Sequence, residues 1–187
     1  MTITAAEVIT ETVARYGDEY TPQHVADTYE SMQAMEQRRK AGVWYTPQPV
    51  VEFMTRFAFD VAFKRIGPTA ADILRIVAVD PCCGTGPYLI QGAKFLATQY
   101  AGRLWKSDPT EEMVYAVLPT IILSCMFGVD IDPVAAELAR ICVARETDGV
   151  LTPEQLEQHI AQGDTLKDEM PPALVARIGP RAEEVAA

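Results

Sequence analysis

Hydrophobic positions along the chain follow two different spacings, and the two alternate. Apolar residues at helical spacing, with helix-start signals around them, predict helices in the first 40 residues and at 50–61, 88–100, 110–124 and 133–145. An Ile- and Val-rich run at residues 73–79 predicts a strand buried on both faces, as in a parallel sheet. Residues 125–131 predict a second strand and residues 159–161 a weaker third. This alternation predicts an α/β layered sheet with right-handed crossovers.

Two of the helices have clear start signals. Thr21-Pro22 and Thr46-Pro47 each combine a capping threonine with a proline that suits the first helical turn. Apolar residues follow Thr46 in a broad stripe, which predicts a helix packed on a core. The stripe consists of Val50, Val51, Phe53, Met54, Phe57, Ala58 and Val61.

The pattern divides the chain into three parts. Residues 1–40 form an N-terminal helical segment, residues 41–166 hold the α/β domain, and residues 167–187 form a C-terminal tail. The tail contains three prolines and has no clear period, so we predict a loop there, with a short helix at 172–178 as the alternative.

Composition narrows the function classes. The 187 residues, 49% of them hydrophobic, suffice for one domain with a core. A net charge of −10 makes tight DNA binding by this chain alone a poor hypothesis, because DNA-binding proteins neutralise phosphates with basic residues. The four cysteines show no C-x-x-C spacing, so no metal site is predicted. Without a signal-peptide pattern or an apolar run long enough to span a membrane, we expect a soluble cytoplasmic protein.

The segment VDPCCGTGPYLI, residues 79–90, predicts a strand end, a glycine turn and a helix start. Gly84 and Gly86 allow the backbone to approach a ligand closely, at the strand ends where α/β sheets bind ligands. The dinucleotide pattern G-x-G-x-x-G fails because position 89 is Leu89. The P-loop pattern fails because Pro87 and Tyr88 occupy the positions of its lysine and hydroxyl residue.

A carboxylate is predicted at the tip of each strand: Asp80, Asp130 and Asp164. Asp80 can pair with a cation, Asp130 can accept from both hydroxyls of a ribose, and Asp164 can accept from an adenine amine. Together they suit an adenosine that carries a positive group and an amine, a description that S-adenosylmethionine fits. Taken singly, each aspartate has an equally good alternative as a helix N-cap.

Four segments in this order resemble the S-adenosylmethionine-dependent DNA methyltransferases that modify the exocyclic amine of adenine, above all the methylase parts of Type I and single-chain restriction–modification enzymes. They are GVWYTPQPVVEFM, DPCCGTGPYLI, FGVDIDPVAAELARI and GDTL, and the resemblance spans residues 38–166. It implies a Rossmann-like methyltransferase fold that binds S-adenosylmethionine.

The resemblance also implies a role for individual residues. Tyr45, Thr46 and Pro47 would lie against the methionine end of the cofactor. Asp80 would face its amino-acid part, within a lining formed by Pro81, Cys82, Gly84, Thr85 and Gly86. Asp130 would bind the ribose and Ile131 would pack on the adenine. Asp164 would bind the adenine amine, with Thr165 beside it.

One motif of the family is missing. Its catalytic sequence is Asn or Asp, then Pro-Pro, then an aromatic residue, at the tip of the fourth strand. Here Pro171-Pro172 is flanked by Met170 and Ala173, which offer neither an acceptor nor a stacking ring. We therefore predict no catalytic residue in this chain and an incomplete parallel sheet. The 73–79 strand would keep an open edge, covered by the tail or, as we favour, by a protein partner or a second copy.

Three functions remain open. In the first, the chain would be the cofactor-binding part of a DNA adenine methyltransferase, either completed by another chain or truncated. It would then contact DNA only within a larger assembly. Alternatively, it is an inactive S-adenosylmethionine-binding or interaction protein derived from such an enzyme. The third alternative is an unrelated nucleotide-binding module.

Overall fold

The computed structural model describes residues 3–33, 46–167 and 169–179, and its centre is a three-stranded parallel sheet in the order β1-β2-β3. The strands are β1 (Ala78–Asp80), β2 (Met126–Asp130) and β3 (Ile160–Gln162). In the register, Asp80 lies opposite Gly128, and Asp130 lies opposite Gln162. All three carboxyl ends therefore lie at one edge of the sheet, as the sequence predicts for a layered α/β fold.

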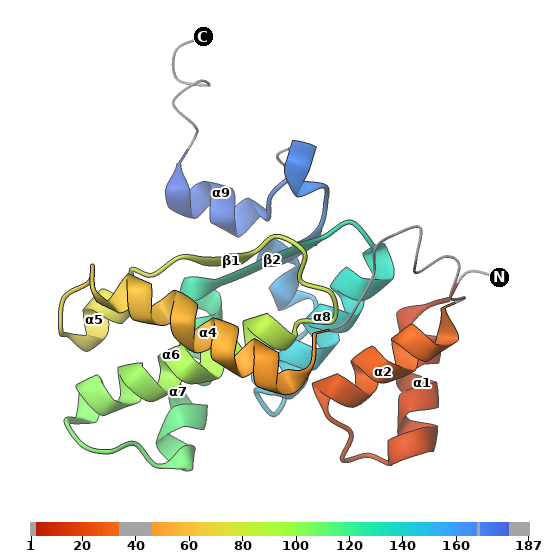
Figure 1. Ribbon diagram of the computed structural model, residues 1–187, viewed down its shortest axis with the longest axis horizontal. Helices are drawn as coiled ribbons and strands as arrows, with labels where there is room; N and C mark the ends of the chain where they lie inside the picture. Colours follow the sequence, from red (N-terminus) through yellow and green to blue (C-terminus); the bar gives the residue numbers. More distant parts are fainter. Residues whose placement is uncertain (1–2, 34–45, 168, 180–187) are drawn as a thin grey trace, which may run out of the picture.

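Helices surround this sheet. In chain order they are α1 (Ala5–Tyr16), α2 (Pro22–Met32), α4 (Gln48–Phe63), α5 (Ala70–Ile73), α6 (Pro87–Trp105), α7 (Glu111–Cys125), α8 (Pro133–Arg145) and α9 (Pro172–Ile178), with short 3₁₀ turns η1 (Gln155–Gln158) and η2 (Thr165–Lys167). Figure 1 shows α4, α6, α7 and α8 on one side of the strands and α9 on the other. The α1–α2 hairpin packs on α8.

Local capping explains where several of these helices begin. The hydroxyls of Thr4, Thr21, Thr69 and Thr110 each accept a hydrogen bond from the backbone N–H three residues on. Asp132 caps α8 by accepting from the Val134 N–H. Inside the fold, the fully buried residues Leu96, Leu118, Ile121 and Leu138 join α6, α7 and α8 into one core. The predicted fold class and the helices α2, α7 and α8 are confirmed. The loop predicted for the C-terminal tail is wrong at 172–178, where the alternative, a short helix, forms α9.

The first predicted strand is wrong in length and in burial. Residues 70–73 form helix α5 instead, whose Ile73 side chain is fully buried, and β1 covers only Ala78–Asp80. Val77 and Val79 are 37% and 40% exposed, so one face of this strand is open rather than covered. The apolar run correctly indicates that Ile73 is buried, but it does not indicate that this residue lies in a helical turn.

The helix predicted after Thr46 does pack on the core, but most of its predicted apolar stripe does not. The helix buries Val51, Thr55 and Phe59, while Phe53 and Phe57 are 67% and 63% exposed and stack on each other. Val50, Met54 and Val61 are exposed beside them. The helix is therefore apolar on a second face that the described residues leave uncovered. The helix also begins one residue later than predicted, because Pro47 rather than Thr46 occupies the N-cap position.

Packing of β2 against the glycine turn gives a test of this fold. A methyl group added at Gly128 would lie 2.7 Å from Leu89 Cδ1 and 3.1 Å from Cys83 Sγ. We expect Gly128→Ala to lower the free energy of unfolding by about 1–3 kcal/mol, the usual range for overpacking a core. Urea denaturation monitored by circular dichroism measures it.

Gly102 in α6 provides the matched control. Its added methyl would meet only ordinary contacts, the nearest at 3.6 Å, and the position is helical. Gly102→Ala should leave stability unchanged or raise it by up to about 1 kcal/mol. Equal effects of the two substitutions would contradict the packing described here.

Candidate functional site

The glycine turn joins β1 to α6 and has the backbone shape that the sequence predicts. Gly84 and Gly86 have φ of 54° and 91°, a left-handed region that favours glycine. A side chain at Gly86 would also approach Ala139 Cβ at 3.4 Å. The turn is fixed to β2 because the Cys83 N–H donates to the Val129 carbonyl at 2.9 Å. The loop thus presents bare backbone at the carboxyl end of the sheet.

Asp130, at the end of β2, binds this turn from the neighbouring strand. Its Oδ2 accepts from the Gly84 N–H at 2.8 Å and its Oδ1 accepts from the Asp132 N–H at 2.9 Å. Each carboxylate oxygen has a second lone pair, so further hydrogen bonds remain available to a ligand. The N-cap alternative does not hold for Asp130, because Asp132 caps α8.

Asp80, at the end of β1, has one carboxylate oxygen without a hydrogen-bond partner among the described residues. Its Oδ1 accepts from the Cys82 N–H at 3.2 Å, whereas the buried Oδ2 has no hydrogen-bond partner in the part of the chain that the structure describes. Burial, together with the negative charge of Asp130, raises the pKa of Asp80 above its ordinary value. Native buried acceptors are nearly always satisfied, so this oxygen marks a position where a ligand donor or cation would fit.

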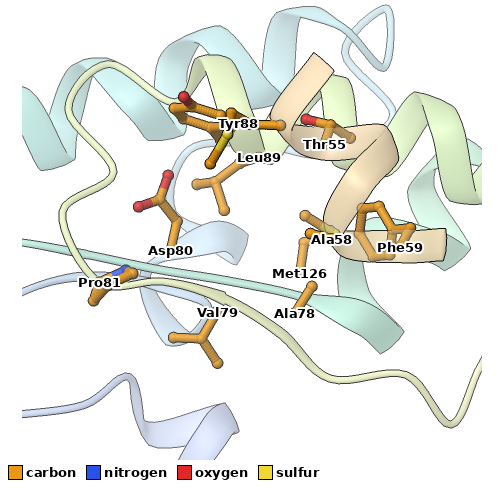
Figure 2. Close-up of a pocket in the computed structure, with 11 residues that line it drawn as sticks. Thr55, Ala58, Phe59, Ala78, Val79, Asp80, Pro81, Tyr88, Leu89 and Met126 are labelled. Carbon is orange, nitrogen blue, oxygen red and sulfur yellow. The ribbon is translucent and has the colours of Figure 1, made fainter. Parts of the chain in front are cut away.

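A cavity of about 300 Å³ opens beside Asp80, between α4 and β1. Its walls are mostly apolar, with Asp80 as the single carboxylate (Figure 2). Figure 2 shows the Asp80 carboxylate on the side of Tyr88, while Val79 points away from it across β1. The lining consists of Met54, Thr55, Ala58, Phe59, Ala78, Val79, Asp80, Pro81, Tyr88, Leu89 and Met126. Tyr88, Met54 and Thr55 are site residues that sequence reasoning missed.

The third strand tip also reaches the glycine turn. Thr165 Oγ1 donates to the Pro81 carbonyl at 3.4 Å. Asp164 caps its own loop, because its Oδ1 accepts from the Leu166 N–H at 3.1 Å, and its Oδ2 lies 3.1 Å from Lys167 Nζ. The predicted carboxylates thus stand at three successive strand ends, and hydrogen bonds connect Asp130 and Thr165 to the turn that follows Asp80.

The other predicted cofactor-binding residues differ in how exposed they are and in whether they line the cavity. Cys82 is exposed on the turn, whereas Cys83 is buried and burial raises the pKa of its thiol. Thr85 is completely buried and its hydroxyl has no partner among the described residues. Ile131 is 68% exposed, an open apolar surface beside Asp130. Thr46 and Pro47 precede α4 but do not line the cavity, and Tyr45 lies outside the described residues.

Comparison with known proteins agrees with this geometry. The model of the N-6 DNA Methylase family matches residues 21–177, which is most of the chain, so the chain belongs to that family. A segment of 77 residues is 32% identical to the Type II methyltransferase M.VspI of Vibrio sp. (strain 343). That match covers 41% of this chain and 16% of the relative, so the matched segment is a small part of the longer protein. No solved structure matches the chain significantly.

In the described residues, no helix has both the length and the apolar character needed to cross a bilayer. All four cysteines are free thiols, three of them buried.

The raised pKa of Asp80 leads to a pH-dependent test. A carboxyl group with a raised folded-state pKa binds more protons in the native state than in the unfolded state, so its contribution to stability falls as pH rises through that interval. Asp80→Asn removes this penalty and keeps an acceptor for the Cys82 N–H. We expect Asp80→Asn to raise the free energy of unfolding more at pH 7 than at about pH 4, the ordinary range of an aspartate.

Asp72 is the matched control, because its pKa is lowered by hydrogen bonds from Thr69. A lowered pKa stabilises the fold above the ordinary value and that contribution is lost as pH falls. Asp72→Asn should therefore be more damaging at pH 7 than at pH 4, the opposite sign to Asp80→Asn. Urea denaturation of both variants at the two pH values measures the difference, and the same sign for both would contradict the assignment for Asp80.

Proposed function

We propose that the chain is the S-adenosylmethionine-binding part of a DNA methyltransferase that modifies the exocyclic amine of adenine, in a restriction–modification or related system. The observation that carries the proposal is the arrangement of Asp80 and Asp130 around a bare glycine turn, with one carboxylate oxygen of Asp80 buried and unpartnered. Membership of the N-6 DNA Methylase family supports the choice of cofactor. The free cysteines agree with a reducing, cytoplasmic setting.

The residues present fit this cofactor. The unpartnered Asp80 Oδ2 is suited to the amino group of its methionine part, and the free lone pairs of Asp130 to the ribose hydroxyls. Exposed Ile131 offers an apolar surface for the adenine ring, and Asp164 an acceptor for its amine. When bound, S-adenosylmethionine supplies an electrophilic methyl group. This chain would bind and orient the cofactor that carries the methyl group.

No residue of this chain is proposed to act on the target base. The sequence contains no asparagine, and none of its three Asp-Pro pairs, which begin at Asp80, Asp108 and Asp132, is followed by a second proline. A flipped base needs an acceptor for its amine and a ring to stack on. We therefore propose that the isolated chain does not methylate DNA. The same observation favours a second candidate function, an inactive cofactor-binding or interaction protein derived from such an enzyme.

The surface beside the cavity supports completion by another polypeptide. Within residues 3–33, 46–167 and 169–179, no strand pairs with the outer edge of β1. The exposed stripe on α4, which we call the α4 stripe (Val50, Phe53, Met54, Phe57 and Val61), adjoins this edge because Met54 lines the same cavity as Ala78 and Val79. An unpaired edge beside a contiguous apolar face is an interaction surface or an aggregation hazard.

We propose that the occupant of this surface is a polypeptide that adds a strand parallel to β1, covers the α4 stripe, and brings the missing Asn/Asp-Pro-Pro-aromatic sequence. Charge supports that view, since a chain with net charge −10 needs a basic partner to approach DNA.

Cofactor binding is tested by titrating the purified chain with S-adenosylmethionine in a calorimeter. We expect binding by the wild type and a loss of about tenfold to hundredfold in affinity for Asp130→Ala, because hydrogen bonds to a charged acceptor contribute about 1.5–3 kcal/mol. Asp108→Ala, an exposed aspartate in the loop between α6 and α7, is the control and should bind like wild type. Because Asp130 also holds the Gly84 N–H, circular dichroism must confirm that the variant is folded.

Unchanged affinity in a folded Asp130→Ala variant would remove the ribose assignment. Absence of binding by the folded wild-type chain would remove the proposed cofactor. Methylation of adenine in DNA by the pure chain would show that it contains a catalytic group after all.

The partner surface is tested by replacing the two stacked rings of the α4 stripe. Phe53→Glu with Phe57→Glu should abolish co-purification of a partner from the cells that encode the chain, because two charges would be buried in an apolar contact. Mass spectrometry identifies the partner, which must contain an Asn/Asp-Pro-Pro-aromatic sequence. Stability of the variant should match that of wild type, since both side chains are already exposed.

Leu104→Glu with Leu123→Glu is the matched control, because these side chains on α6 and α7 are 47% and 41% exposed and lie outside the α4 stripe. The control should retain the partner. Equal loss in both double variants, or a wild-type chain that captures no protein with that motif, would contradict the proposed interface.

A further inference from the structure

One side chain of the N-terminal hairpin reaches the proposed cofactor loop. Tyr29, on α2, is only 3% exposed, and its hydroxyl donates to Asp132 Oδ2 at 2.6 Å across 103 positions of sequence. Such a short O–H to carboxylate distance is typical of a charge-assisted hydrogen bond. Burial and the adjacent Asp132 carboxylate raise the pKa of Tyr29, so the hydroxyl stays protonated and donates at neutral pH.

This bond is the outer end of a continuous series. Asp132 Oδ1 accepts from the Val134 N–H at 2.9 Å, which begins α8. The Asp132 N–H donates to Asp130 Oδ1 at 2.9 Å, and Asp130 Oδ2 accepts from Gly84 at 2.8 Å. Three of these hydrogen bonds therefore connect α2 to the glycine turn through two carboxylates, and the fourth ties Asp132 to the start of α8. Ile131, the exposed apolar residue of the loop, lies between the two aspartates.

The packing of the hairpin does not depend on this hydroxyl. Val8, Val25 and the Tyr29 ring belong to the apolar core that the hairpin shares with the rest of the molecule. A phenylalanine at position 29 would keep the ring in that core. The hydroxyl group thus has a separable effect, which is to fix the orientation of the Asp132 carboxylate.

We propose that Tyr29 is a positioning residue for the cofactor site, holding Asp132 and through it the Asp130–Ile131 loop in the geometry that receives the adenosine. The N-terminal hairpin is then an integral part of the site rather than an appended segment. This inference rests on the proposed binding of S-adenosylmethionine. It adds a residue that lies 16 positions before Tyr45, the first of the predicted cofactor residues.

Tyr29→Phe tests the inference, with Tyr16→Phe as the matched control. Tyr16 is on the same hairpin, is 42% exposed and stacks on His24, away from Asp132. In calorimetric titrations with S-adenosylmethionine, we expect Tyr29→Phe to weaken binding about tenfold and Tyr16→Phe to leave it unchanged. Hydrogen exchange without ligand should show faster exchange of the Asp132 and Val134 amides in Tyr29→Phe alone.

A double-mutant cycle separates positioning from general destabilisation. Asp132→Ser keeps a capping hydroxyl for the Val134 N–H but removes the acceptor of Tyr29. If the hydroxyl acts through Asp132, adding Tyr29→Phe to Asp132→Ser should cause no further loss of affinity, whereas independent effects would multiply.

The outcomes distinguish the two proposals. Wild-type affinity in Tyr29→Phe, or multiplying losses in the cycle, would overturn the positioning role and leave cofactor binding intact. Failure of the wild-type chain to bind S-adenosylmethionine would overturn the proposed function, and the positioning role with it.

Discussion

The carboxylate of Asp130 is the interaction on which the site depends. It stands at the end of β2 and accepts a hydrogen bond from the Gly84 N–H in the turn after β1, so it ties that turn to the neighbouring strand. Its other oxygen accepts a hydrogen bond from the Asp132 N–H. Asp132 is the N-cap of α8, and its carboxylate accepts a hydrogen bond from the Tyr29 hydroxyl. A neutral residue of the same size would offer fewer acceptors to these donors. The end of β2 and the glycine turn therefore share the Asp130 carboxylate, and the N-terminal hairpin is linked to it through Asp132.

This arrangement is unfavourable for stability in the absence of a ligand. Asp80 and Asp130 place two negative charges at adjacent strand ends, and one oxygen of Asp80 is buried without a partner in the described chain. Gly84 and Gly86 have left-handed backbone conformations beside them. Local costs of this kind gather at functional sites, where a ligand can offset them. A cofactor with a positive charge and several donors would relieve both costs together.

The sequence predicted those features that local chemistry determines. The Thr21-Pro22 pair correctly predicted the start of α2, although the similar Thr46-Pro47 pair does not place a threonine cap on α4. The positions of Asp80, Asp130 and Asp164 at strand ends followed from apolar runs that stop at polar residues. It failed where the outcome depends on what lies opposite. Ile73 is buried, but it lies in helix α5 and not in a strand. The α4 stripe is apolar, but the described residues do not cover it. Periodicity identifies a face that prefers burial, but not which residues bury it. The bond between Tyr29 and Asp132 has no sequence signal, because it joins residues 103 positions apart.

The two errors of prediction concern neighbouring parts of the fold, β1 and α4, which line one cavity. β1 is shorter and more open than an inner strand, and α4 exposes two stacked rings next to it. In a parallel sheet, an inner strand is covered on both faces and paired on both edges. One further strand beside β1 would pair its open edge, and a polypeptide segment under α4 would cover the stacked rings. The charge of −10 indicates that such a strand would belong to a basic polypeptide if the assembly acts on DNA. A single partner would then cover the open edge, bury the α4 stripe and supply the DNA-binding charge that this chain lacks.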